Sequence, residues 1–519
     1  MARVLIVSTN RERTPFPVMP VGPALVAAHA QRAGHDVRVL DLMFEKDPEQ
    51  AASHAVASFD PEVIGVGMRN IDNSDLIETK YYVPDVERML GAIRSAAPRT
   101  PIVLGGAATS IEPEALLGLW GPAGSFAAGR SAPLVDMILT GDAEKRFPLL
   151  LDRLLSGAPA DDVSGLCRPG PDGGARWNRI GLAEPIDDLA DARLFDVVDV
   201  KRYARADGVY PIQTKRGCAF TCTYCTYGSL EGLRTRYRPV AEIVDEIERA
   251  ADRGVVHFEF VDAVFSHPPV QARAVCEELI RRGLPRRIAL TASGFNPVGV
   301  TEALVALMKR AGFRSLSATV EGASTTMLRR MQKGFEAEDV ARIAEWLPRH
   351  GIPAVWIFLI GSPGETLETV DETFTFIAER IPRRDLVYIT NGVRVYRGTG
   401  LHRSLVASGH IRPDQPLLEP YFVFSASLPR DVYLQKLLAF ARAHPNVVNS
   451  FEAGQPVVAS LARLLGRLPL PRPRWRMLPL IRRFGSPFRD VRADALVASA
   501  WPIVSDADIT ASAEVSAAT

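Results

Sequence analysis

Short segments rich in aliphatic and β-branched residues alternate with helical stretches in two long series along this 519-residue chain. The first series runs from residue 3 to about 150, and its five expected strands are 3–9, 36–43, 63–68, 101–106 and 137–144. Strands that alternate with helices pair in parallel, because each helix returns the chain to the same edge of the sheet. Residues 1–150 are therefore predicted to form an α/β domain with a doubly wound, Rossmann-like sheet, whose ligand binds beyond the carboxyl ends of the strands.

The second series occupies residues 206–400, and its six expected strands are 210–217, 255–265, 287–295, 314–322, 354–366 and 385–396. Six β/α units predict a (β/α)6-type partial TIM barrel, with its chemistry at the carboxyl ends of the strands. Residues 151–205, between the two series, are rich in Gly, Pro and acidic side chains, which is typical of a connector. Residues 401–519 are expected to form a small, mainly helical region with a poorly ordered tail from about 493.

Charge and hydropathy exclude several classes of partner. The formal net charge is +1, and the 61 Lys and Arg are scattered among 60 Asp and Glu, so the chain has no basic footprint for nucleic acid. The first apolar run is too short for a signal sequence, and no run of about 18 apolar residues could span a membrane. A cytoplasmic protein is expected, in a reducing compartment that keeps its five cysteines as thiols.

Three of the five cysteines, Cys218, Cys222 and Cys225, lie within eight residues directly after the first strand of the second series. Three thiolates on one loop can converge on a single point and select a soft metal or an iron–sulfur cluster. A structural zinc site is disfavoured because it needs four ligands, whereas Cys167 and Cys276 stand alone in a loop and in a helix. Three cysteines can instead bind three irons of a 4Fe–4S cluster and leave the fourth iron open to another ligand.

The stretch CAFTCTYC, from Cys218 to Cys225, resembles the signature of the radical S-adenosylmethionine (SAM) superfamily, including an aromatic residue, Tyr224, before the third cysteine. The resemblance implies that the open iron binds the amino and carboxylate groups of SAM, with Tyr224 beside them. It also implies that one electron cleaves SAM to methionine and a 5′-deoxyadenosyl radical.

The same resemblance assigns two acidic residues to SAM. Residues 317–335 resemble the segment that carries an acid, here Glu321, toward SAM, and residues 359–366 resemble a later strand-end motif. Many members have Gly-Gly-Glu after the second barrel strand, where this chain has FVDAVF, so Asp262 is the acid available for the methionine amino group. Two ordinary roles stay open, a helix-capping acid for Glu321 and a solvated turn for Asp262.

The first domain lacks the glycine turn of dinucleotide-binding domains, because its first strand is followed by STNRERTPF instead of G-x-G-x-x-G. Its element order, with segments 66–75, 103–110 and 140–144, resembles the cobalamin-binding domain of B12-dependent radical SAM enzymes. The resemblance covers roughly residues 3–430. The cobalamin contacts that it implies at the strand ends are Arg69, Asn70, Asp72, Gly105, Gly106, Thr140, Gly141 and Glu144.

The lower face of the cobalt is expected to carry no histidine, since the D-x-H-x-x-G motif is absent and the first histidine, His29, lies within a helix. Arg69 and Asn70 follow the third strand, where a side chain could reach the lower face of the corrin. A guanidinium there would disfavour an axial ligand, although Arg69 could instead pair with Asp72 or Asp75. Gly105 and Gly106 either admit a flat ligand or make a tight turn.

The resemblance implies a cobalamin-dependent radical SAM methyltransferase that acts on an unactivated carbon of a small biosynthetic intermediate. One SAM would methylate cobalamin and a second would yield the radical, with electrons from a donor such as flavodoxin or ferredoxin. A rearrangement or oxidation without methyl transfer, such as ring contraction, would share every motif and differ in product mass. A B12-based regulator is disfavoured, because no output module is recognisable after residue 400.

Overall fold

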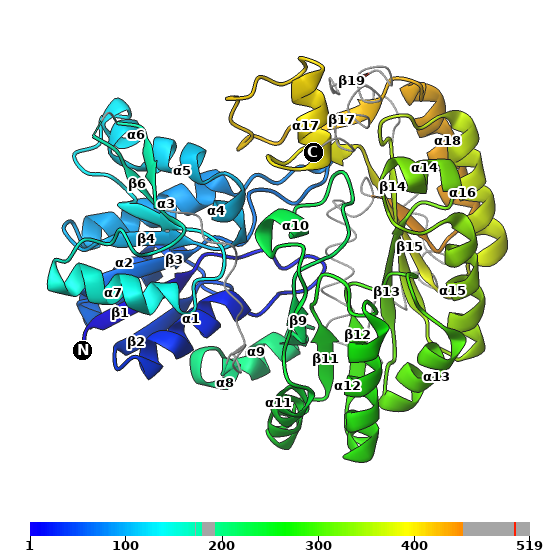
Figure 1. Ribbon diagram of the computed structural model, residues 1–519, viewed down its shortest axis with the longest axis horizontal. Helices are drawn as coiled ribbons and strands as arrows, with labels where there is room; N and C mark the ends of the chain where they lie inside the picture. Colours follow the sequence, from blue (N-terminus) through cyan, green and yellow to red (C-terminus); the bar gives the residue numbers. More distant parts are fainter. Residues whose placement is uncertain (172, 179–192, 450–502, 505–519) are drawn as a thin grey trace.

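The computed structural model describes residues 1–171, 173–178, 193–449 and 503–504 (Figure 1). Its N-terminal sheet has seven strands in the order β2-β1-β3-β4-β5-β6-β7. The first five are parallel and confirm the predicted strands: β1 (Arg3–Ser8), β2 (Asp36–Asp41), β3 (Val63–Gly67), β4 (Ile102–Gly105) and β5 (Met137–Leu139). An antiparallel hairpin of β6 (Leu166–Pro169) and β7 (Ala175–Trp177) extends the sheet beyond residue 150, into the expected connector.

Both faces of this sheet are covered, because successive residues of a strand point to opposite sides. On β1, Val4 and Ile6 pack into one core, whereas Leu5 and Val7 pack into another. The first face is covered by α1 (Val21–Arg32) and α7 (Arg146–Ser156); the second is covered by α2 (Pro48–Phe59), α3 (Val83–Ala96) and α5 (Pro113–Trp120). Two short helices, α4 (Ala107–Ile111) and α6 (Pro122–Ala127), complete the domain.

The second half of the chain forms an arc of parallel strands. The strands are β8 (Tyr210–Ile212), β11 (His257–Phe260), β12 (Ala289–Ala292), β13 (Leu316–Glu321), β14 (Ala354–Ile360), β15 (Leu386–Asn391) and β18 (Val447–Asn449). Single bridges, such as Phe295 to Ala318, join β12 to β13. The six predicted barrel strands are confirmed, and β18 adds a seventh from the C-terminal region.

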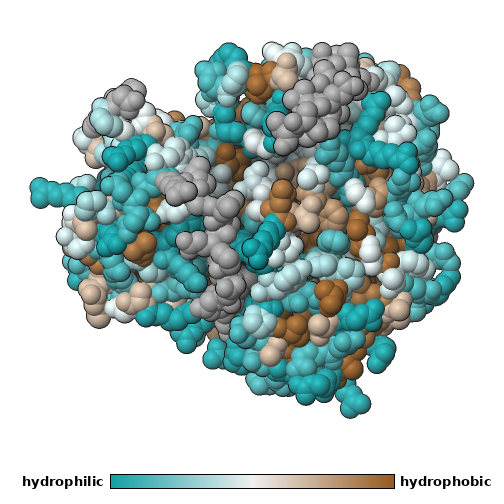
Figure 2. Space-filling model, viewed as in Figure 1, coloured by the Kyte–Doolittle hydropathy of each residue, from teal (hydrophilic) through white to brown (hydrophobic). Residues whose placement is uncertain are grey.

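Helices cover the outside of this arc (Figure 1): α11 (Val240–Asp252), α12 (Pro269–Arg281), α13 (Glu302–Ala311), α15 (Ala337–Arg349), α16 (Leu367–Arg380) and α18 (Arg430–Ala443). On α11 one apolar face is buried, with Ile243, Ile247 and Ala250 in the core. The outer rim of the molecule is mostly hydrophilic (Figure 2).

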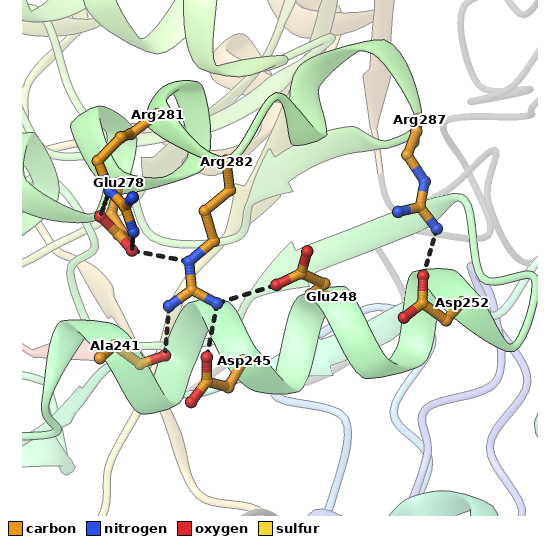
Figure 3. Close-up of polar contacts among 8 residues, drawn as sticks. All are labelled: Ala241, Asp245, Glu248, Asp252, Glu278, Arg281, Arg282 and Arg287. Carbon is orange, nitrogen blue, oxygen red and sulfur yellow. Dashed lines mark hydrogen bonds and ion pairs between the residues drawn. The ribbon is translucent and has the colours of Figure 1, made fainter.

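An ion-pair group on α11 and α12 belongs to this outer surface. Figure 3 shows Arg282 bridging Asp245 and Glu248 of α11 to Glu278 of α12. Arg281 pairs with the same Glu278. Surface pairs of this kind contribute little to stability individually, so the group is part of the solvated exterior of the barrel.

Short elements connect these units or close the barrel: α8 (Leu194–Val197), α9 (Val200–Arg205), β9 (Lys215–Arg216), α10 (Tyr227–Leu230), β10 (Arg236–Tyr237), a 3-10 turn (Leu284–Arg286), α14 (Thr325–Arg330), β16 (Val393–Arg394), α17 (Gly400–Ala407), β17 (Phe422–Ser425) and β19 (Ile503–Val504). The region after residue 400 is thus mixed, since β17 pairs with β16 and β18 pairs with β15. The described part of this region is nevertheless mainly helical, as expected, because α17 and α18 make up most of its regular structure and the strands are short. The expected disordered tail from about 493 lies outside the described residues, apart from β19.

None of the helices in the described part of the chain combines the length and apolarity that crossing a bilayer requires.

Candidate cofactor site between the two domains

A cavity of about 570 Å³ lies between the first domain and the barrel. The first domain contributes the carboxyl ends of β3, β4 and β5, and the barrel contributes residues such as Gln213, Thr226 and Tyr227. Because Thr226 directly follows Cys225, the cavity reaches the cysteine loop. Seven of the eight residues predicted at the strand ends line it: Arg69, Asn70, Asp72, Gly105, Gly106, Gly141 and Glu144.

The eighth predicted residue, Thr140, forms hydrogen bonds within the first domain. Its hydroxyl donates a hydrogen bond of 3.0 Å to the carbonyl of Gly165, and its backbone N–H donates to the same carbonyl. Thr140 therefore fastens β5 to the segment that leads into β6 and does not line the cavity.

The two glycines at the end of β4, Gly105 and Gly106, differ in how closely other backbone atoms approach them. Gly106 has φ of +112°, and a Cβ atom there would lie 2.3 Å from the carbonyl oxygen of Met68. A Cβ on Gly105 would lie at an ordinary 3.5 Å from the carbonyl oxygen of Leu139. Gly106 is therefore required by the close approach of two backbones, which is the tight-turn alternative, whereas Gly105 leaves the cavity wall free of a side chain.

Arg69 lies exposed on the cavity wall. Within the described part of the chain it forms no ion pair, because both acids considered for it have other partners. Asp72 accepts hydrogen bonds from Arg394 at 2.8 Å and from Tyr396 at 3.2 Å. Asp75 accepts from the backbone of the residues after it and from Tyr388 at 3.4 Å. Arg69 therefore does not pair with Asp72 or Asp75 in this structure.

Two predicted cavity acids hold the domains together. Asp72 pairs with Arg394 of the barrel, and Glu144 pairs with Arg216 at 2.5 Å. Arg216 also contacts Asp142 at 2.8 Å, and these two acids raise its pKa above the ordinary arginine value despite burial. The prediction that Asp72 and Glu144 contact cobalamin stays a prediction: both residues line the cavity, and each also forms an interdomain ion pair through its carboxylate.

The cysteine loop runs from β9 to α10, and all three of its cysteines are free thiols. Thr223 anchors the loop, because its N–H donates to the carbonyl of Met331 and its carbonyl accepts from the N–H of Leu401. At its start, Gly217 has φ of +94°, and a Cβ there would lie 2.2 Å from the carbonyl oxygen of Arg234. The loop geometry therefore requires glycine next to Cys218.

Burial disfavours the thiolate form of the three cysteines. Desolvation raises the pKa of Cys225 to about 11, and it raises the pKa values of Cys218 and Cys222 as well. The charges of Cys218 and Cys222 act on Cys225, so the three side chains share one region. Among the described residues no three His, Cys, Asp or Glu side chains already form a closed metal site. Binding of a metal or cluster to these cysteines would displace the thiol protons.

Tyr224, Glu321 and Lys333 form a polar group beside this loop. The Tyr224 hydroxyl donates a hydrogen bond of 2.5 Å to Glu321, and the buried Lys333 ammonium contacts both Glu321 and the Tyr224 hydroxyl. Burial lowers the pKa of Lys333, whereas the nearby cysteine thiolates act in the opposite direction. The helix-capping alternative for Glu321 is wrong, because Ser324 occupies the N-cap of α14.

Glu321 has φ of +59°, a left-handed conformation that is rare for a residue with a side chain. It ends β13, at the edge of the barrel that faces the cysteine loop. Strained backbone of this kind concentrates at binding and catalytic sites.

Asp262 is buried and has a structural task. Its carboxylate accepts hydrogen bonds from the N–H and hydroxyl of Thr214, at 2.7 and 2.5 Å, and from the N–H of Lys215 at 3.2 Å. It therefore fastens the end of β11 to the strand that leads into the cysteine loop. The solvated-turn alternative is wrong, because Asp262 is buried. The contact with the methionine amino group of SAM stays a prediction, and it would add to the protein donors that both oxygens already have.

Two family models match this chain in the order that its two domains have. The B12 binding domain matches residues 8–132, and the radical SAM superfamily matches residues 212–377. The chain belongs to the B12-dependent radical SAM proteins. A protein of this family combines cobalamin, SAM and a 4Fe–4S cluster.

Curated relatives of this B12-dependent radical SAM protein include methyltransferases. An uncharacterized methyltransferase of Pyrococcus horikoshii is 25% identical over 69% of this chain and 72% of its own length. The tryptophan 2-C-methyltransferase of Streptomyces laurentii is 24% identical over 75% of this chain and 72% of its own length. Among solved structures, the radical SAM methyltransferase TsrM from Kitasatospora setae, with cobalamin and a 4Fe–4S cluster bound, superimposes with a TM-score of 0.78. That match covers 93% of this chain and 99% of TsrM at 23% identity, and it shows that the two share a fold.

The side chains of this B12-dependent radical SAM protein fit the cofactors of its family. Three free thiols on one loop supply the donors for three irons, and the cavity beside them has one wall made of strand-end glycines, where a flat molecule can approach the backbone. Sequence reasoning missed Lys333 and Arg216, which matter here only through tertiary contacts. A signal for Lys333 was available, since it lies within the segment 317–335 that already resembled a SAM-binding region.

Proposed function

We propose that this protein transfers a methyl group from SAM, by way of cobalamin, to an unactivated carbon of a small biosynthetic intermediate. The observation that carries the proposal is the shared cavity, which is lined both by Arg69 at the end of β3 and by Thr226 next to Cys225. A methyl carrier bound in the first domain and a SAM-cleaving cluster bound on the loop would thus serve one reaction space. When bound, cobalamin supplies the methyl carrier and the cluster supplies the electron that cleaves SAM.

The polar group beside the loop supports SAM as the ligand. SAM carries an ammonium and a carboxylate on one carbon. Glu321 supplies a negative charge that can pair with the ammonium, and Lys333 supplies a positive charge that can pair with the carboxylate. In this structure the two side chains neutralise each other, with Tyr224 donating to the same carboxylate. An incoming zwitterion can replace that pair without leaving either buried charge unmatched.

Arg69 supports a cobalamin without a lower protein ligand. Its guanidinium has no lone pair to offer a metal, and it lies on the cavity wall contributed by the first domain. A fixed positive charge there would oppose coordination below the cobalt, which favours release of the methyl group on the other face.

An external one-electron donor such as flavodoxin or ferredoxin is part of this proposal, because the cluster must be reduced in each turnover. We also propose a cytoplasmic location, since free thiols of this kind persist in a reducing compartment.

Product mass tests the proposed function. Protein reconstituted anaerobically with iron, sulfide and hydroxocobalamin would be incubated with reductant, candidate intermediates and SAM that carries a ¹³C-labelled methyl group. A product that gains one labelled CH2 supports methyl transfer. A changed carbon skeleton with no added label would instead support the rearrangement or oxidation that the same cofactors allow.

A further inference from the structure

Side chains that face the barrel interior are more accessible than those that face its helices. On β11, Phe258 and Phe260 are fully buried, whereas Glu259 between them is partly exposed. The same alternation occurs on β13 and β14, where Thr319 and Ile357 are partly exposed between fully buried neighbours. Interior residues of a TIM barrel normally pack into closed layers, so the accessible ones here border space inside the barrel.

Glu259 is a charged residue among these inward-facing side chains, and it stabilises no other part of the described structure. In the described part of the chain no side chain or backbone group donates a hydrogen bond to it. Its register neighbours are Thr291 on β12 and Pro211 on β8. The hydroxyl of Thr291 accepts a hydrogen bond of 3.2 Å from Ser315, and proline has no N–H to donate. Desolvation raises the pKa of Glu259 to about 7, although the charge of Arg69 opposes the shift.

Two buried acids of the barrel, Asp262 and Glu365, differ from Glu259 because they accept hydrogen bonds that stabilise the fold. Asp262 holds Thr214 and Lys215, and Glu365 accepts the N–H of Gly361 at 2.7 Å within a strand-end turn. Buried carboxylates need such donors, because an unmatched one is costly. Glu259 differs from these acids because it is partly exposed inside the barrel, so its carboxylate is hydrated there and is available to accept a hydrogen bond from a bound molecule.

The position of Glu259 connects it to the cofactor cavity. Val261, two residues farther along the chain, lines the cavity together with Arg69. Glu259 therefore lies next to the cavity, and the charge of Arg69, which lines the cavity, acts on its carboxyl group. Across the arc, β14 offers an aliphatic surface of Val355, Ile357 and Leu359.

We propose that Glu259 binds the substrate, and that the substrate carries a protonated nitrogen next to an apolar body. The nitrogen supplies the donor that Glu259 lacks, and the apolar body lies against Ile357 and Leu359. An anionic group at the same position is disfavoured by repulsion from the carboxylate. This inference rests on the proposed function, since it names the class of molecule that the methylation site accepts.

Binding of three probes with a common body tests the inference: tryptamine is a cation, indole is neutral and indole-3-acetate is an anion. Equilibrium dialysis at pH 8 would compare them on holoprotein loaded with cobalamin and cluster. The reconstituted wild type should bind tryptamine at least about tenfold more tightly than indole or indole-3-acetate. Glu259→Gln should abolish this preference and leave indole binding unchanged.

The matched control is Glu248→Gln, which removes the same charge from the outer surface of the barrel shown in Figure 3. It should keep the full preference for tryptamine. Equal binding of the three probes, binding of none, or an equal loss in both variants would overturn the inference. Cobalamin content and SAM cleavage, measured on the same samples, separate the role of Glu259 from the proposed function. If cobalamin binding and SAM cleavage are both lost while the preference for tryptamine is kept, the result counts against the proposed function alone. If cobalamin binding and SAM cleavage are normal but the preference is absent, the result counts against the role of Glu259 alone.

Discussion

Arg394 of the barrel donates a 2.8 Å hydrogen bond from Nε to the carboxylate of Asp72 in the first domain, and the two side chains are 2% and 0% exposed. The same guanidinium also donates to the carbonyls of Val395 and Leu417. A buried charge pair of this kind joins residues 322 positions apart, so it couples the stability of one domain to that of the other.

Removing one partner of this pair should be strongly destabilising. Arg394→Met leaves the Asp72 carboxylate buried without its counter-charge, which costs about 3–5 kcal/mol. The double variant Asp72→Asn with Arg394→Met should recover a large part of this loss, because no unmatched charge remains. Thermal unfolding of the two variants and the wild type checks the prediction. Equal losses in the single and the double variant would show that the pair contributes through packing alone.

The three loop cysteines should be sufficient protein ligands for the cluster. Replacing Cys218, Cys222 and Cys225 together with Ala should abolish the brown colour and the binding of about four irons per chain. Cys167→Ala and Cys276→Ala should keep both, since these thiols are buried in the first sheet and in α12. Iron and sulfide analysis after anaerobic reconstitution measures the outcome, and a need for either isolated cysteine would contradict the three-ligand assignment.

Arg69→Ala should separate cobalamin binding from methyl transfer. Most of the cavity wall is unchanged in this variant, so cobalamin should still bind, with its own base displaced. Water should gain access to the lower face of the cobalt, which the electron paramagnetic resonance spectrum of the Co(II) form reports. Methyl transfer should slow more than SAM cleavage. An unchanged spectrum with full turnover would assign Arg69 no role at the cobalt.

Lys333→Met should weaken SAM binding by about tenfold or more, because a charge-assisted contact is lost and Glu321 keeps an unmatched charge. Lys333→Arg should restore most of the affinity, since it keeps the positive charge. Equilibrium dialysis with SAM on cluster-loaded protein gives both values. If Met and Arg at this position behave alike, the lysine acts only through packing.

Glu259 should make the folded state less stable at high pH. Its pKa in the folded state is about 7, above its ordinary value of 4.5, so the folded form holds the proton more tightly. The contribution is therefore complete below pH 4.5 and is lost as the pH rises through 7. Glu259→Gln should raise the stability relative to wild type at pH 8 by up to roughly 3 kcal/mol, and by little at pH 5. Melting temperatures at the two pH values measure this, and a pH-independent difference would contradict it.

Strand periodicity was enough to predict the parallel framework from the sequence. Five strands of the first sheet and six of the barrel were identified, because short apolar segments that alternate with helices commonly form parallel sheets. The cysteine loop was equally clear, since its chemistry depends on local spacing. Short edge strands such as β7 and β18 were missed, because three residues carry too little periodicity and their pairing depends on strands far away in the sequence.

Site residues were predictable only where their role is local. The position of Gly106 follows from a turn, whereas the ion pairs of Asp72 and Glu144 could not be predicted, because their partners, Arg394 and Arg216, belong to the other domain. The inward direction of Glu259 could have been deduced from its two phenylalanine neighbours. Its lack of a donor could not, because that depends on every element packed around the strand.

The interdomain ion pairs at the cavity also bear on how long the cofactor stays bound. Asp72 and Tyr396 border the cavity at one place, and Glu144 and Arg216 border it at another, so charged contacts between the domains flank the space on two sides. Opening the domains far enough to release a molecule as large as cobalamin would break buried ion pairs that are expensive to separate. Cobalamin is therefore expected to behave as a resident prosthetic group that survives many turnovers, while SAM and the substrate exchange through the barrel.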